Sequence, residues 1–157
     1  MPNITPNLWF ESQAEEAAEL YTSIFPNSSI DHVERYGPGA PLPEGTVMTV
    51  AFSLDGKRFV GLNGGPAFAF TEAISFIIEC VDQAEVDHYW GALTADGGQE
   101  SQCAWLKDRF GVSWQVVPRR LMELLGDPDP ERAGRAMEAM LLMRKIDIAA
   151  VERAADG

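Results

Sequence analysis

Hydrophobic and polar residues follow the same order in two consecutive blocks of this chain. Each block opens with a short apolar segment, residues 4–10 in the first block and 74–81 in the second. A segment with the 3.6-residue apolar spacing of a helix follows in both blocks, and apolar strands around Gly turns close them. The pattern predicts a β-α-β-β-β module that occurs twice, and such repeats decide the fold.

Both predicted helices begin with the same local signal. Ser12 is followed three residues later by Glu15, and Asp82 by Glu85. In such a capping box the first and fourth side chains each accept a backbone N–H that the helix leaves unpaired. The remaining strands are expected over residues 29–36, 47–54 and 59–63, and over 102–107 and 112–117.

Each module is too small to bury a good core by itself. A doubly wound sheet would need more helices between the strands than the pattern provides. We therefore predict an α+β fold over residues 1–118, in which modules 3–66 and 72–118 pair. The pair would form a curved mixed sheet with helices outside and a cleft inside.

Residues 119–157 are expected to form a C-terminal helical extension. The segment Asp127-Pro128-Asp129-Pro130 predicts the start of a helix over 131–143, with an Asp as cap and a Pro in the first turn. Methionines at helical spacing are typical of a core or a subunit interface, and less often of a flexible ligand surface. The apolar face expected for this helix consists of Ala133, Met137, Met140 and Leu141.

The charge of the chain excludes several classes of partner. Its 157 residues include 12 Lys and Arg against 24 Asp and Glu, which gives a formal net charge of −12. Nucleic-acid binding needs a basic stripe that this chain lacks, and anionic membrane surfaces would repel it. Two cysteines, Cys80 and Cys103, are too few for a disulfide framework and are expected as free thiols. With no signal-peptide pattern and no long apolar run, we expect a cytoplasmic protein.

Several segments resemble the PhnB-like branch of the vicinal oxygen chelate superfamily, a branch also labelled demethylubiquinone methyltransferase-like. The superfamily also contains glyoxalase I, extradiol dioxygenases and bleomycin-resistance proteins. The resemblance implies the paired βαβββ fold, a homodimer, and a small-molecule site in the cleft. It also implies a divalent metal that takes two substrate oxygens. The segments that carry it are residues 4–10, 21–28, 54–56, 62–66, 72–76, 105–118 and 143–148.

The metal-ligand positions implied by this resemblance do not hold suitable side chains. By alignment they fall on Pro6, Gly61, Phe76 and Gln115, of which only Gln115 has a ligating side chain. One neutral amide does not hold a metal. A shift of one residue gives Asn7, Leu62 or Asn63, and Ser75, which are also poor ligands. The sequence therefore predicts a cleft without a metal cofactor.

Other chemistries have no motif in the chain. The Gly-rich residues 61–66 do not lead into a capped helix, as a cofactor-binding loop of a methyltransferase would. Neither a P-loop nor a nucleophile elbow is present. Strand alternation instead suggests apolar and amide side chains for the concave face of the cleft. The candidate ligand-binding residues are Phe10, Asn63, Phe76, Cys103, Trp105 and Gln115.

Three functions remain open at this stage. The first is a metal-free homodimeric protein that binds an unknown small molecule. The second is an enzyme, either a metal-dependent lyase or isomerase of glyoxalase type or a metal-free enzyme using Glu79 or a cleft amide. The third is a protein-interaction module that uses the Met-rich extension.

Overall fold

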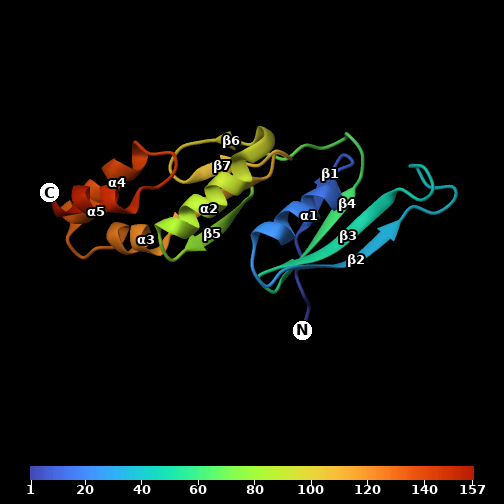
Figure 1. The fold of residues 1–157 in the computed structure, drawn as a ribbon, viewed down its shortest axis with the longest axis horizontal. Coiled ribbons are helices and arrows are strands. Elements are labelled where there is room, and N and C mark those ends of the chain that lie inside the picture. The colour runs from blue at the N-terminus through green and yellow to red at the C-terminus, as the bar shows by residue number, and fades with distance from the viewer. The chain divides into compact units, whose positions relative to one another are not determined.

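The computed structural model describes residues 1–157 and divides into two compact units, Met1–Phe70 and Thr71–Gly157 (Figure 1). Each unit contains a four-stranded mixed sheet and a helix that follows its first strand. This confirms the α+β class and the repeated βαβββ module. None of the helices is both long and apolar enough to cross a membrane.

The first unit has the strand order β1-β4-β3-β2, with β1 parallel to β4. Aromatic side chains fill the space under its helix: Tyr21 packs near Phe52, which stacks on Phe59 with ring centroids 5.5 Å apart. The elements of this unit are β1 (Asn7–Phe10), α1 (Ala14–Ile24), β2 (Ser29–Arg35), β3 (Val47–Leu54) and β4 (Lys57–Asn63).

The capping box predicted at Ser12 and Glu15 does not form. Gln13 is the N-cap residue of α1, and its side chain makes no capping hydrogen bond. Instead, the backbone N–H of Ala14 donates to Oδ1 of Asn63 at 2.8 Å. The parallel pairing of β1 with β4 brings Asn63 opposite Phe10, next to the start of the helix. A side chain from a distant strand therefore takes the place of the local cap.

The second unit has the strand order β5-β8-β7-β6, with β5 parallel to β8. Its capping box is confirmed: Asp82 accepts the N–H of Glu85, and Glu85 accepts the N–H of Val81. The elements are β5 (Ser75–Cys80), α2 (Gln83–Thr94), a 3-10 turn (Ala95–Gly97), β6 (Gln99–Glu100), β7 (Trp105–Lys107) and β8 (Ser113–Pro118).

The strand expected over residues 102–107 begins only at Trp105. Cys103 and Ala104 both have positive φ, 56° and 75°, which extended backbone does not allow. Their N–H groups donate to the carbonyls of Met143 and Arg144 in the extension, each at 2.9 Å. The two-residue strand β6, which the hydrophobic pattern did not single out, completes the module.

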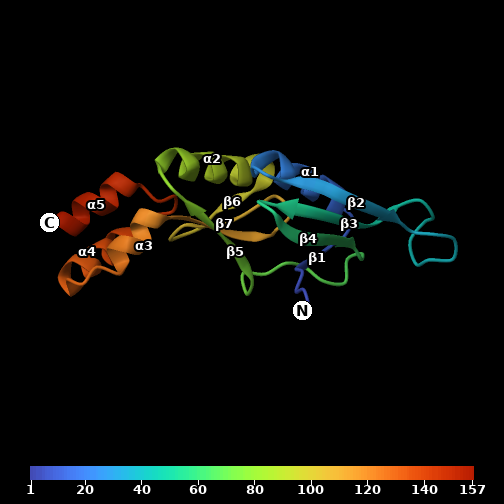
Figure 2. The ribbon, with the colours of Figure 1, turned by 90° about the horizontal axis from the view of Figure 1, so that it is seen from below.

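The extension consists of α3 (Arg119–Leu125), α4 (Pro130–Leu141) and α5 (Ile148–Asp156), grouped at the C-terminal end of the second unit (Figure 2). It forms an apolar core that includes Ala104 and Val117 of the sheet region. The other buried members of this core are Leu121, Leu124, Ala136, Ile146, Val151 and Ala155.

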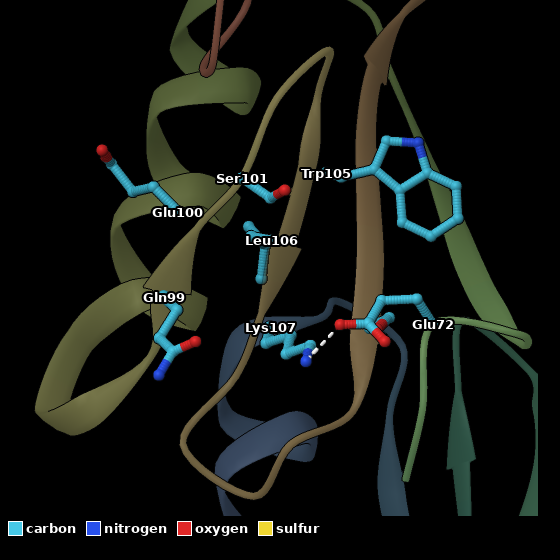
Figure 3. A pocket seen from close by; sticks show the side chains of 8 residues that line it. Glu72, Gln99, Glu100, Ser101, Trp105, Leu106 and Lys107 are labelled. Carbon is cyan, nitrogen blue, oxygen red and sulfur yellow. Dashed lines mark ion pairs between the residues drawn. The ribbon is translucent and has the colours of Figure 1, made fainter.

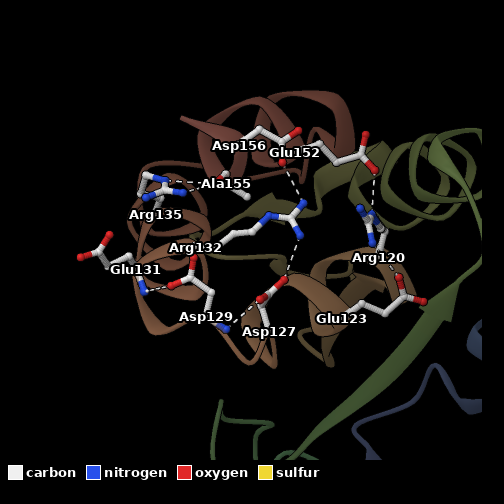
Figure 4. A network of polar contacts seen from close by, with 10 residues as sticks. All are labelled: Arg120, Glu123, Asp127, Asp129, Glu131, Arg132, Arg135, Glu152, Ala155 and Asp156. Atoms are coloured by element: carbon white, nitrogen blue, oxygen red, sulfur yellow. Dashed lines mark hydrogen bonds and ion pairs between the residues drawn. The ribbon is translucent and has the colours of Figure 1, made fainter.

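The apolar face predicted for α4 is only partly correct. Ala136 is fully buried and Met140 packs against the core, but Met137 and Leu141 remain exposed. Two arginines beside the buried face contact α5. Arg132 pairs with Asp156 of α5 and with Asp127 before α4, and Nε and Nη2 of Arg135 both donate to the carbonyl of Ala155 (Figure 4). Small and polar contacts, rather than the methionine spacing, thus set the rotation of this helix.

Candidate functional site

One face of the second sheet carries two rows of side chains that point away from α2. Residues directly opposite each other in neighbouring strands point to the same face. The first row is Ile77, Gln115 and Trp105, and the second row is Ser75, Ser113 and Lys107. The opposite face holds buried residues that pack with α2, namely Ile78, Leu106, Trp114 and Val116.

Two of the predicted site residues lie side by side on this open face. Trp105 and Gln115 are direct partners across β7 and β8, and both are partly exposed. Gln115 donates from Nε2 to Oγ of Ser75 at 2.8 Å, which fixes the amide and leaves Oε1 directed to other partners. The pair thus offers an aromatic surface beside an oriented amide oxygen.

The face predicted for Phe10, Asn63 and Phe76 is reversed in the structure. Phe10 and Asn63 lie on the side of the first sheet that α1 covers, since Asn63 caps that helix and Phe10 is 2% exposed. Phe76 is the strand partner of the buried Trp114, and their ring centroids are 5.4 Å apart. Alternation alone does not say which face the helix covers, and an offset of one residue exchanges the two faces.

Cys103 lies in the left-handed segment before β7 rather than on a strand. Both cysteines are free thiols, with Cys80 buried and Cys103 partly exposed. Burial raises the pKa of the Cys80 thiol to about 12, so that it stays protonated and unreactive at neutral pH.

A pocket of about 140 Å³ lies in the second unit beside Trp105 (Figure 3). Lys107 and Glu72 form an ion pair across it. The hydrogen bond from Lys107 lowers the pKa of Glu72 below its ordinary value, so that this carboxylate is ionised at neutral pH. Ser113 also lines the pocket, and its buried Oγ has no hydrogen-bond partner.

These three polar residues were not predicted as site residues from the sequence. Lys107 and Ser113 were expected only as parts of strands, and Glu72 precedes β5 in an irregular segment. The register that pairs Lys107 with Ser113 could have indicated the cluster, but a single sequence does not fix that register. The ion pair with Glu72 has no local sequence signal.

A larger hollow of about 330 Å³ lies in the first unit, between the start of α1 and the loop around Pro43. Asn63 lines it, but both polar atoms of the amide already have a protein partner: Oδ1 caps α1, and Nδ2 donates to the carbonyl of Val47 at 3.0 Å. The other polar side chains there include Glu11 and Glu15. This hollow therefore lacks a free amide to orient a ligand.

The side chains present do not fit a divalent metal site. On the open face of the second sheet, the parallel strands β5 and β8 offer one carboxylate, Glu79, which is paired with Arg119, and one amide, Gln115. The corresponding face of the first sheet offers Trp9 and Leu62, which are strand partners opposite the helix-covered side. No group of three or more His, Cys, Asp or Glu side chains is placed to hold a metal ion. Imidazole and carboxylate ligands are what such sites need.

The Gly-rich segment after β4 is a packed turn. A Cβ on Gly64 would lie 2.3 Å from the Trp9 ring, so that glycine is required by the close approach of the indole. The indole N–H of Trp9 donates to the carbonyl of Gly65 at 2.9 Å. Packing therefore accounts for Gly64, whereas Gly65 has a φ of 88°, in the left-handed region that favours glycine.

The two βαβββ modules define this chain as a protein of the vicinal oxygen chelate fold. Residues 2–117 match the model of a family described as 3-demethylubiquinone-9 3-methyltransferase, and the chain belongs to this PhnB-like family. Residues 118–157, which include all three helices of the extension, lie beyond the matched region.

One solved structure supports this assignment, and two others share the fold. A protein from Bacillus cereus described as a putative 3-demethylubiquinone-9 3-methyltransferase, PhnB protein, is 34% identical with a TM-score of 0.68, covering 74% of this chain and 99% of its own. PA1353 from Pseudomonas aeruginosa is 21% identical with a TM-score of 0.60, covering 75% and 98%. The fosfomycin resistance protein FosX from Listeria monocytogenes shares the fold at 15% identity and a TM-score of 0.57, covering 80% and 98%. No curated protein matches the chain.

Proposed function

We propose that this protein binds a small molecule, without a metal, on the open face of the second sheet. The observation that carries the proposal is the pairing of Trp105 with Gln115 beside the pocket. An aromatic wall with a few oriented polar groups is the usual composition of a small-molecule site. In this arrangement the flat part of the ligand packs on the Trp105 indole.

The amide of Gln115 orients the bound ligand. Its Nε2 is held by Ser75, and Oε1 therefore accepts a hydrogen bond from an N–H or O–H group of the ligand. The exposed side chain of Ile77, in the same row, extends the apolar surface. Together these groups favour a ligand that has a flat apolar body, and a hydrogen-bond donor on that body adds a contact with Gln115.

We further propose that the protein acts as a homodimer in the cytoplasm. The family resemblance implies the dimer, and the exposed Ile74 is an apolar side chain that a second copy would cover. The free thiols accord with a reducing compartment.

Ligand binding is tested by measuring thermal stabilisation and fluorescence changes with a panel of single-ring aromatic amides, acids and ketones. Trp105→Ala should weaken any ligand found by about tenfold or more, since an aromatic contact and its buried area are lost. Gln115→Leu should weaken only ligands that carry a donor. Trp9→Ala, which removes an indole from the first unit, is the matched control. Unchanged affinity in Trp105→Ala would place the site elsewhere.

The metal-free part of the proposal is tested by elemental analysis of protein purified without chelator, with added Zn²⁺, Ni²⁺ and Mn²⁺. We expect no stoichiometric metal and no thermal stabilisation by these ions. Metal bound near one equivalent per chain would contradict this and favour a lyase or isomerase of glyoxalase type.

A further inference from the structure

The pocket beside Trp105 contains a buried hydroxyl without a partner. Ser113 is 1% exposed, and its Oγ makes no hydrogen bond within the protein. Buried polar groups are nearly always paired, because an unpaired one loses its hydration without compensation. Since Ser113 lines the pocket, a bound ligand can supply the missing partner.

A cation lies next to this hydroxyl. Lys107 is the direct strand partner of Ser113, and side chains at such positions have Cβ atoms about 5 Å apart. The ammonium group carries three donors and the hydroxyl one, so the two side chains together present donors to an anionic group. A carboxylate has two oxygens and can accept from both residues at once.

Lys107 already holds a carboxylate, that of Glu72. Glu72 lies outside the strands, and its side chain is 60% exposed, whereas that of Lys107 is 35% exposed. Exposed ion pairs contribute little free energy because water competes for both charges. A carboxylate that arrives with further contacts can therefore replace Glu72 at small cost.

We infer that this pocket recognises the carboxylate of a small, flat organic acid through Lys107 and Ser113, and that Glu72 occupies the position of that carboxylate until the ligand displaces it. The inference rests on the proposed function, since it uses the same pocket and the same Trp105. It adds the chemical class of the ligand and an internal competitor that sets the affinity.

The size and layout of the site agree with a single-ring acid. The pocket of about 140 Å³ is close to the cavity of roughly 150 Å³ that holds benzene in another protein. The row of Trp105 and Gln115 lies two residues along the strand from the row of Lys107 and Ser113, a rise of about 7 Å. The ring of such an acid therefore reaches Trp105 when its carboxylate contacts Lys107.

The inference is tested with benzoate and its uncharged analogue benzamide, by titration of tryptophan fluorescence in the full-length protein. Wild type should prefer benzoate. Glu72→Gln should tighten benzoate binding by about two- to fivefold, because the competing carboxylate is gone, and should leave benzamide binding unchanged. Glu79→Gln is the matched control: it neutralises another exposed, ion-paired acid on the same sheet face.

Two further variants test the donors. Lys107→Met should weaken benzoate binding by about tenfold or more without affecting benzamide, because a charge-assisted hydrogen bond is lost. Ser113→Ala should weaken benzoate binding by a few fold and should fold normally, since it removes an unpaired buried hydroxyl.

The possible outcomes distinguish failure of the carboxylate site from failure of the proposed small-molecule site. If benzamide and benzoate bind equally well, both through Trp105, and neither is affected by Glu72→Gln or Lys107→Met, the carboxylate site is overturned. The small-molecule site then remains in place. An equal gain in benzoate affinity from Glu72→Gln and Glu79→Gln shows a general charge effect and also overturns it. No binding of either probe to any of these chains overturns both.

Discussion

The same three residues, Gln-Ala-Glu, stand at the start of both helices, at 13–15 for α1 and 83–85 for α2, yet the two helices are capped in different ways. In α2 the cap is local, formed by Asp82 and Glu85. In α1 the N–H of Ala14 is satisfied by Asn63, 49 residues further along the chain. Equal local sequences thus lead to different caps when a neighbouring strand end supplies an acceptor.

The hairpin turns of the two units also differ in whether local or buried interactions hold them. Asp55 and Gly56 join β3 to β4 with φ values of 48° and 73°, a two-residue turn that local chemistry explains. The turn between β7 and β8 is built around the buried Asp108, which accepts the N–H groups of Phe110 and Val112 and the indole N–H of Trp114. One turn depends on backbone preference, and the other on a buried carboxylate.

The largest effect is expected from Asp108→Ala. Three donors would lose their acceptor inside the second unit, which should lower the free energy of unfolding by about 3 kcal/mol. Asp55→Ala, at the exposed turn of the first unit, should cost only about 1 kcal/mol, through its left-handed backbone. Urea unfolding of both variants gives the comparison. Equal losses would mean that the buried carboxylate does not distinguish the two turns.

Asn63→Ala should have the next largest effect. It leaves the Ala14 N–H and the Val47 carbonyl without partners, which should cost about 2 kcal/mol. Ser12→Ala should stay within about 0.5 kcal/mol of wild type, because Ser12 does not cap the helix. Thermal unfolding of the two variants measures the difference. A costly Ser12→Ala would restore the local capping box and refute the tertiary cap.

The local cap of α2 is expected to contribute less. Asp82→Ala removes the acceptor for the Glu85 N–H and should cost about 1 kcal/mol. Hydrogen exchange of the first turn of α2 should accelerate, while that of α1 should not change. Faster exchange in both helices would show that the two caps are coupled.

The smallest effect concerns the ion pair between Asp87 of α2 and Lys145 of the extension. The hydrogen bond from Lys145 lowers the pKa of Asp87 in the folded state. A depressed carboxyl pKa stabilises the fold above the unfolded value, about 3.9, and this contribution is lost as the pH falls through the folded value. Asp87→Asn should therefore be slightly less stable than wild type at pH 7 and equally stable near pH 2. A constant difference across this range would contradict the assignment.

The strand pattern and the α2 cap were predictable because they depend on neighbours in the sequence. Val47–Leu54 was predicted with both ends correct, and Asp82 was identified as a cap. The start of β7 was not predictable, because the left-handed backbone at Cys103 and Ala104 is held by hydrogen bonds to Met143 and Arg144. No sequence signal near residue 103 indicates a contact with the extension.

The sequence suggested Trp105 and Gln115, which the structure places together on the open face of the second sheet, but it did not suggest the polar residues around them. Alternation gives the spacing of side chains along a strand, whereas the covered face depends on where the helix packs. That is why Phe10, Asn63 and Phe76 were placed on the wrong face. The pairing of Lys107 with Ser113 and Glu72 likewise depends on register and on the path of an irregular segment.

The sequence by itself determined the repeated βαβββ order, the α+β class and the family, because these follow from periodicity and from motifs that are local in the chain. The tertiary structure decided which face of each sheet is open, how α1 is capped, and which polar groups meet in the pocket beside Trp105. These features join residues that are far apart in sequence. Their energies depend on burial and register, which exist only once the strands have paired.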